Sequence, residues 1–109
     1  MSRKKLIVLS NAVEGREADF NQWYTNRHLA DVLKVPGFVA AQRFEIQGDP
    51  VQGARWRYFA LYDVEHDNPD EAIAELTSRV GTAAMPMSDS MSEAMICALY
   101  SPITDRVIA

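Results

Sequence analysis

The chain has a single cysteine, Cys97, which excludes a disulfide within it. Because disulfides are typical of oxidising compartments, this composition favours a reducing compartment, and we expect a cytoplasmic protein. No apolar run approaches the roughly 20 residues that a transmembrane helix needs. The run Leu6 to Leu9 near the N-terminus is also shorter than the ~7–15 apolar residues of a secretory signal. We therefore expect no membrane partner.

Positive charge is scarce as well. Eleven lysines and arginines face 15 aspartates and glutamates, so the net charge is −4 and the pI is about 5.0. Since nucleic-acid binding depends on cations that neutralise phosphates, we expect no nucleic-acid partner. With 109 residues, 48% hydrophobic and 24% charged, the chain has the size and composition of one globular domain over residues 1–109.

Hydrophobic periodicity and turn residues predict four strands and two helices. Asn68-Pro69-Asp70-Glu71 is typical of a helix start, because it combines a capping residue, a proline suited to the first turn and acids that favour the helix dipole. Residues 29–35 are either a continuation of the first helix or a separate short turn, and 48–53 is a hairpin turn. The predicted elements are a strand over 5–10, a helix over 16–28, strands over 38–47 and 55–64, a helix over 69–80 and a strand over 94–100.

The order β-α-β-β-α-β predicts a ferredoxin-like α+β sandwich, in which two helices cover one face of an antiparallel sheet. Both faces of this sheet are apolar. The third strand carries Phe59 and Leu61 on the face opposite its tyrosines, and Phe38, Ala40, Gln42, Phe44 and Ile46 are expected to share one face of the second strand.

An apolar sheet face without helices would exceed the few hundred Å² of apolar patch that a monomer normally exposes. We therefore predict a homodimer in which the same sheet face of a second copy covers it. The alternative is a monomer whose second face binds aromatic ligands.

One stretch, Asp19 to Phe38, carries the best candidate for chemistry. Its residues Phe20, Trp23, Tyr24, Arg27 and His28 have the spacing of one face of an α-helix, and Pro36-Gly37 ends the segment. The ordinary pKa of histidine lies near neutrality, so His28 is the candidate general acid or base. The alternative is a structural histidine that bonds a carbonyl at the helix end.

Other residues are candidates for substrate binding. Asn11 ends the first strand, where clefts of such sandwiches open, Asp31 can orient the imidazole, and Arg43 can bind a carboxylate or phenolate. The competing interpretations are a turn asparagine, a solvated aspartate, a surface arginine paired with Glu45 or Asp63, and core aromatics. The full candidate set is Asn11, Trp23, Tyr24, Asp31, Arg43, Tyr58 and Tyr62.

Four methionines, Met85, Met87, Met91 and Met95, fall close together. Thioethers can bind copper(I), but adaptable packing at a pocket rim is the favoured interpretation because no histidine lies beside them. No cluster of His, Cys and carboxylates has ligand spacing, so we predict no metal site.

The first helix and its exit read Gly15-Arg16-Glu17-x-x-Phe20-x-x-Trp23-Tyr24-x-x-x-His28-x-x-Asp31-x-x-x-x-Val35-Pro36-Gly37-Phe38. This pattern resembles the EthD-like branch of the dimeric α+β barrel superfamily. The resemblance implies a ferredoxin-like homodimer whose sheets pack face to face. Members of the superfamily include cyclases, monooxygenases and isomerases that need no metal or organic cofactor. They often carry a proline two residues after the histidine, where this chain has Ala30.

Together these observations predict a cofactor-independent enzyme of the isomerase, cyclase or lyase type. Its substrate would be a hydrophobic compound, aromatic or carbonyl-bearing, bound between the first helix and the sheet. The alternative is a non-catalytic small-molecule-binding or accessory homodimer, and a purely structural dimer is the third hypothesis. An open cleft beside His28 would favour the first two over the third.

Overall fold

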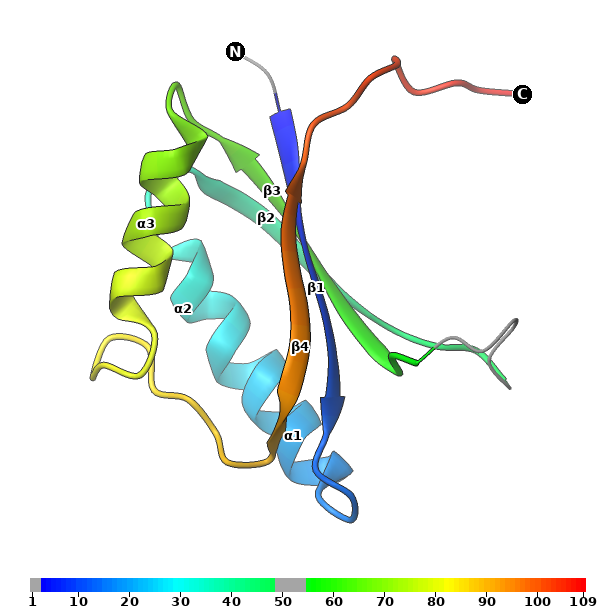
Figure 1. Ribbon diagram of the computed structural model, residues 1–109, viewed down its shortest axis with the longest axis vertical. Helices are drawn as coiled ribbons and strands as arrows, with labels where there is room; N and C mark the ends of the chain where they lie inside the picture. The colour runs from blue at the N-terminus through cyan, green and yellow to red at the C-terminus, as the bar shows by residue number, and fades with distance from the viewer. Residues whose placement is uncertain (1–2, 49–54) are drawn as a thin grey trace.

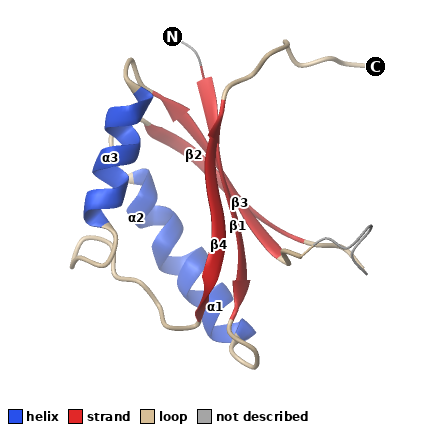
Figure 2. Cartoon of the chain, in the orientation of Figure 1, coloured by secondary structure: helices blue, strands red, loops and turns tan. Residues whose placement is uncertain are grey.

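The computed structural model describes residues 3–48 and 55–109. Its sheet has the order β2-β3-β1-β4, and all neighbouring strands are antiparallel. The helices pack on one face of this sheet (Figures 1 and 2). The ferredoxin-like α+β sandwich predicted from the sequence is therefore confirmed. The elements are β1 (Arg3–Ala12), α1 (Glu17–Trp23), the π-helix η1 (Tyr24–His28), α2 (Leu29–Leu33), β2 (Phe38–Glu45), β3 (Tyr58–Glu65), α3 (Pro69–Arg79) and β4 (Met91–Tyr100).

The core lies between the helices and one face of the sheet. Alternate residues of each central strand point into it, as the two-residue period of a strand requires. On β1 these residues are Leu6, Val8 and Ser10, so burial alternates along the strand even though Leu6 to Leu9 are all apolar. The remaining large core residues are Phe20, Tyr24, Val32, Val35, Phe38, Tyr58, Tyr62, Val64 and Met85.

Strand β2 contains an irregularity that changes which residues share a face. Phe38 pairs with Val64 but Ala40 pairs with Asp63, so one extra residue, Val39, is inserted as a bulge. As a result Phe38 lies on the helix-covered side with Ala41 and Arg43. The prediction that Phe38 shares a face with Ala40, Gln42 and Phe44 is therefore wrong, because a strict alternation does not count the bulge.

Several element boundaries also differ from the predictions: β1 spans Arg3–Ala12 rather than residues 5–10, and β2 ends at Glu45 rather than at residue 47. Strand β3 begins at Tyr58 rather than residue 55, because the side chain of Asn11 binds the backbone of Arg55 and Arg57 just before it. Strand β4 begins at Met91 rather than residue 94. Residues 29–33 continue the first helix. Most of the predicted turn at 48–53 lies outside the described residues.

The second face of the sheet carries no helix (Figure 1). Phe44 and Phe59 stack on it at 4.5 Å between ring centroids, and Ile96 is 44% exposed there. Register places Leu9 between Phe59 and Ile96, so an apolar row crosses all four strands. In the part of the chain that the structure describes, no helix combines the length and apolar character needed to cross a membrane.

The turn that leads from the first helix to β2 depends on Gly37. Its φ is +99°, and its carbonyl accepts a hydrogen bond from the Glu65 backbone N–H at 2.7 Å. A Cβ added at Gly37 would lie 3.0 Å from Cδ2 of His66 and 3.2 Å from its Cβ. A larger residue at position 37 would therefore suffer both backbone strain and crowding.

We expect Gly37→Ala to lower the free energy of unfolding by about 1–3 kcal/mol, measured by urea denaturation. Gly48→Ala is the matched control, since φ there is +68° and nothing lies within 4 Å of an added Cβ. It should cost only the backbone strain of about 1–2 kcal/mol. A loss at position 37 no greater than at position 48 would contradict the role of crowding.

Candidate functional site

A cavity of about 340 Å³ lies between the helices and the β1–β4 half of the sheet. It is largely apolar, and its polar atoms come from a histidine, two tyrosines, a threonine and the cysteine. Its volume is at the lower end of the range usual for small-molecule sites. The lining residues are Leu6, Val8, Tyr24, His28, Val32, Tyr62, Leu76, Thr77, Val80, Met87, Met91, Met95 and Cys97.

A larger hollow of about 470 Å³ lies elsewhere and is not the candidate site. It is lined by Asn11, Arg57 and Glu45 among others, and it borders residues outside the described ranges. Arg57 is already paired with Glu45 at 2.8 Å, and Asn11 is bonded to backbone. The polar groups of the 470 Å³ hollow bind one another and the backbone at the start of β3. In the 340 Å³ cavity, by contrast, not all polar groups are paired.

The first helix contains one π turn where it borders the cavity. The Leu29 backbone N–H bonds to the carbonyl of Tyr24, five residues earlier. The wider turn brings Trp23 and His28 into stacking contact, with ring centroids 4.6 Å apart and planes at 27°. Tyr24 meets the same imidazole edge-on at 4.8 Å. Such single π turns are frequent at functional sites.

The π turn also corrects the helical face predicted from α spacing. Phe20, Tyr24 and His28 are buried, but Arg27 is exposed. The Arg27 side chain instead pairs with Asp31, with 2.7 Å between Nε and Oδ2. An extra residue in the turn rotates the helix surface, so that the 3.6-residue period no longer applies through residue 27.

The imidazole of His28 is buried, with 8% of the residue exposed. Its Nδ1 has no hydrogen-bond partner and is the sole such buried side-chain nitrogen or oxygen in the described residues. The other nitrogen, Nε2, is therefore more exposed than Nδ1. We expected one nitrogen to bond within the protein at the helix end, and among the described residues none does. An unpaired buried polar group costs about 1–3 kcal/mol, which calls for a functional explanation.

Burial lowers the pKa of His28 from its ordinary 6.5 to about 4, because the apolar surroundings disfavour the imidazolium, and the carboxylate of Asp31 opposes this only in part. The imidazole is therefore neutral at pH 7. The sequence-based expectation of a pKa near neutrality is wrong, since it ignored desolvation. A neutral imidazole can accept a proton or a hydrogen bond but is not a ready acid.

Two tyrosines form a hydroxyl pair at the cavity. Tyr62 donates a hydrogen bond to the hydroxyl oxygen of Tyr24 at 3.0 Å. Burial raises the pKa of both phenols, so both are protonated at neutral pH. Tyr24 is 2% exposed and Tyr62 is 1% exposed. Their hydroxyls are thus positioned by the fold and held away from bulk water.

Arg43 contacts the Tyr24 ring but is not among the residues that line the cavity. Its guanidinium carbon is 4.6 Å from the Tyr24 ring centroid, and its nitrogens donate to Asn21 Oδ1 at 2.9 Å and to Thr25 Oγ1 at 2.8 Å. Burial lowers the pKa of Arg43, although a guanidinium stays charged. The arginine does not line the cavity, nor does it pair with Glu45 or Asp63.

The remaining predicted site residues lie outside the cavity lining. Asp31 is 2% exposed and holds Arg27 and Lys34, and the hydroxyl of Tyr58 accepts a hydrogen bond from Asn21 Nδ2 at 3.2 Å. Trp23 contacts the site through His28, on which it stacks, and through Tyr24, whose ring centroid is 5.3 Å away. The structure therefore brings three predicted residues to the cavity: His28, Tyr24 and Tyr62.

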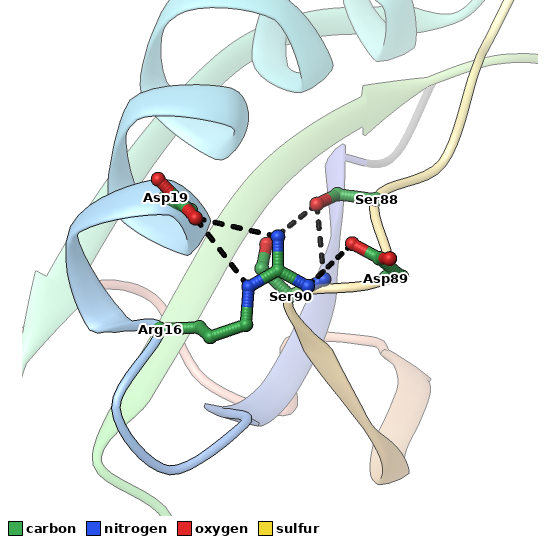
Figure 3. Close-up of polar contacts among 5 residues, drawn as sticks. All are labelled: Arg16, Asp19, Ser88, Asp89 and Ser90. Carbon is green, nitrogen blue, oxygen red and sulfur yellow. Dashed lines mark hydrogen bonds and ion pairs between the residues drawn. The ribbon is translucent and has the colours of Figure 1, made fainter.

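Residues 81–90, the loop between α3 and β4 (yellow in Figure 1), form part of the cavity wall. Arg16 ties the loop to the start of the first helix by pairing with Asp89 at 2.6 Å and with Asp19 at 3.3 Å (Figure 3). The indole N–H of Trp23 donates to the Pro86 carbonyl at 3.1 Å. These bonds hold Met87 at the cavity.

The methionine segment divides into core and rim. Met85 is fully buried in the core, whereas Met87, Met91 and Met95 line the cavity, as the favoured interpretation of adaptable packing predicted. The described residues contain no group of three or more His, Cys, Asp or Glu that could hold a metal. Sequence reasoning missed the α3 contribution and Cys97, which the structure pairs with Val8 across β1 and β4.

Comparison with known proteins supports the fold. No family model matches the chain, and no curated protein matches it. Solved structures do match over nearly the whole chain. An EthD-like protein from Ralstonia eutropha has a TM-score of 0.69 at 14% identity, covering 97% of this chain and 96% of that one. An EthD family protein from Bacillus halodurans has a TM-score of 0.62 at 18% identity, covering 93% and 99%.

A third match is the heme degrader MhuD from Mycobacterium tuberculosis, with two hemes bound in its active site. Its TM-score is 0.62 at 20% identity, covering 95% of this chain and 99% of that one. The resemblance to EthD-like proteins drawn from the helix motif is confirmed in the fold. Identities this low show the fold and leave the reaction to the residues of the cavity.

The burial of His28 predicts a pH-dependent stability. Because its pKa is about 4 when folded and 6.5 when unfolded, the folded state binds fewer protons between these values, so stability falls as the pH falls through this window. As the pH falls from about 7 to about 4.5, the free energy of unfolding of wild type should fall by about 2–3 kcal/mol more than that of His28→Gln, measured by denaturation. Parallel profiles for wild type and His28→Gln would contradict the buried neutral imidazole.

Proposed function

We propose that the 340 Å³ cavity binds a small hydrophobic compound and that His28 acts on it as a general base, in proton transfer of the isomerase, cyclase or lyase type. The supporting observation is the neutral imidazole, which borders an apolar cavity and whose nitrogens have no hydrogen-bond partner among the described residues. A ligand in the cavity would supply a partner for Nε2, whereas Nδ1 is fully buried. No metal or organic cofactor takes part in the proposed reaction.

The lining suits a hydrophobic carbonyl compound. Its side chains are mostly aliphatic, aromatic or thioether, so they favour an apolar ligand body. Nε2 of the neutral imidazole can accept a proton from carbon or oxygen of the ligand. The imidazolium that forms is disfavoured by burial, and this returns the proton to the substrate in a later step.

Heme is a ligand that one neighbour of similar fold holds, and the residues here do not fit it. The two hemes of MhuD lie in that protein's active site. The propionates of a heme are anionic, and no lysine or arginine is among the residues that line this cavity. Burying carboxylates without cationic partners is strongly unfavourable. We therefore derive no step through heme.

The alternative function is non-catalytic binding of a small molecule. A low pKa makes His28 a weak base, and the same neutral nitrogen can simply accept a hydrogen bond from a ligand. This alternative keeps the cavity and the ligand class but predicts no chemistry. A substitution that removes the titratable proton of His28 distinguishes the two functions, because only catalysis needs that proton.

We expect His28→Gln to lose roughly 10²–10⁴-fold in the rate of proton exchange, the usual contribution of a general base. The probe reaction is exchange of the α-hydrogens of 2-tetralone for deuterium in D₂O, followed by NMR. Melting temperature at pH 7 and affinity for the ketone should change little, because glutamine keeps the size and a hydrogen-bonding group. His66→Gln should exchange at the wild-type rate.

Exchange that persists in His28→Gln, together with a lowered melting temperature, would remove His28 from the mechanism. No exchange by wild type despite measurable binding of the ketone would favour the non-catalytic function.

We also propose a homodimer formed by the open face of the sheet. The apolar row from Phe44 through Phe59 and Leu9 to Ile96 supports it, because no helix covers these side chains. Covering the row with the same face of a second copy removes it from water on both chains.

Light scattering at micromolar concentration should give twice the 12.2 kDa mass of the chain. Ile96→Lys should shift the mass toward the monomer, because it places a charge in the proposed interface. Leu33→Lys changes an equally exposed aliphatic residue on the helix layer and should leave the mass unchanged. A wild-type monomer at this concentration would contradict the proposal.

A further inference from the structure

We infer that the Tyr24 hydroxyl is the hydrogen-bond donor that holds a substrate carbonyl oxygen, and that the substrate is a carbonyl compound with a hydrogen on the adjacent carbon. The substrate class rests on the proposed function of His28. The placement of the donor rests separately on the hydroxyl pair.

The hydrogen bonds of the two tyrosines leave one hydrogen unused. Each phenol has a single hydrogen, and that of Tyr62 is donated to Tyr24. Among the described residues, none accepts the hydrogen of Tyr24. The Tyr24 residue is 2% exposed, so water does not readily take the place of an acceptor. A ligand oxygen in the cavity can take that place, since both tyrosines belong to its lining.

Two features of the surroundings of Tyr24 favour its hydroxyl as a hydrogen-bond donor. The bond received from Tyr62 withdraws electron density from its oxygen. The Arg43 guanidinium, 4.6 Å from the ring centroid, stabilises negative charge on the phenol. Both effects act against the rise in pKa that burial of Tyr24 causes. The tyrosine therefore favours an oxygen that gains negative charge.

Tyr24 and His28 then act on neighbouring atoms of one substrate. They lie one helical turn apart with ring centroids at 4.8 Å, and both line the cavity. The C–H bond next to the carbonyl breaks, and its proton moves to Nε2 of His28. The bonding pair forms a carbon–carbon double bond as the carbonyl π pair moves onto oxygen, where Tyr24 donates to it. Return of the proton to either end of the enolate conserves atoms, electrons and charge.

The test compares two neutral probes of the same shape, acetophenone and α-methylstyrene, which has a methylene group in place of the carbonyl oxygen. Tyr24→Phe should weaken binding of acetophenone by about 3–10-fold, the effect of losing a neutral hydrogen bond, and leave α-methylstyrene affinity nearly unchanged. Tyr62→Phe should cause a smaller loss with the same selectivity, because it removes only the bond that Tyr24 receives. Tyr100→Phe removes a phenol hydroxyl from the opposite face of the sheet and should match wild type.

Equal affinity of wild type and Tyr24→Phe for acetophenone would overturn the inference, and so would equal losses for both probes, since these indicate lost packing. Should Tyr24→Phe fail to fold, Tyr62→Phe decides by the same selectivity. His28→Gln should keep the preference for acetophenone over α-methylstyrene. A preference that persists while 2-tetralone exchange is absent would reject the proposed function and leave the donor role of Tyr24 in place.

Discussion

The hydrogen bond from the Leu29 N–H to the Tyr24 carbonyl sets the geometry on which the candidate site depends. It adds one residue to a helical turn, and a π turn is rarely formed without compensation. Here the compensation is visible in packing, because Trp23 and Tyr24 both contact the imidazole that the turn carries inward. A continuous α-helix would instead set Trp23 and His28 well apart around its axis.

The indole of Trp23 also connects His28 to the loop that forms part of the cavity wall. Trp23 stacks on His28 with its ring and bonds the Pro86 carbonyl with its N–H. Arg16 adds a second tie between the helix start and the loop through Asp89. The position of the loop and the orientation of the imidazole therefore share one support. Burial of the imidazole in this arrangement is what lowers the pKa of His28.

Much of the fold follows from the sequence because its signals are local. The helix start at Asn68-Pro69 and the stop at Pro36-Gly37 act within a few residues, and the alternation of β3 places its tyrosines correctly. The bulge at Val39 and the π turn escape such reasoning, since each adds one residue to a repeat without a residue type that marks it. The sequence suggested His28 but not its desolvation, which arises from residues of α3 and β4 that pack around it only in the folded chain.

The candidate binding residues also differ in whether local sequence signals could place them. Tyr24 and Tyr62 are found at the cavity because both point to the buried side of their elements. Asn11 is instead used by the backbone of Arg55 and Arg57, and Arg43 by the end of the first helix, partnerships that spacing alone does not reveal.

The central claim is that the π turn holds a neutral imidazole in an apolar cavity. The most direct measurement is the ¹⁵N NMR titration of the His28 ring in the intact protein. We expect one neutral tautomer of the His28 ring at pH 7 and a pKa of about 4. A His28 ring that is protonated at or just below neutral pH would contradict it.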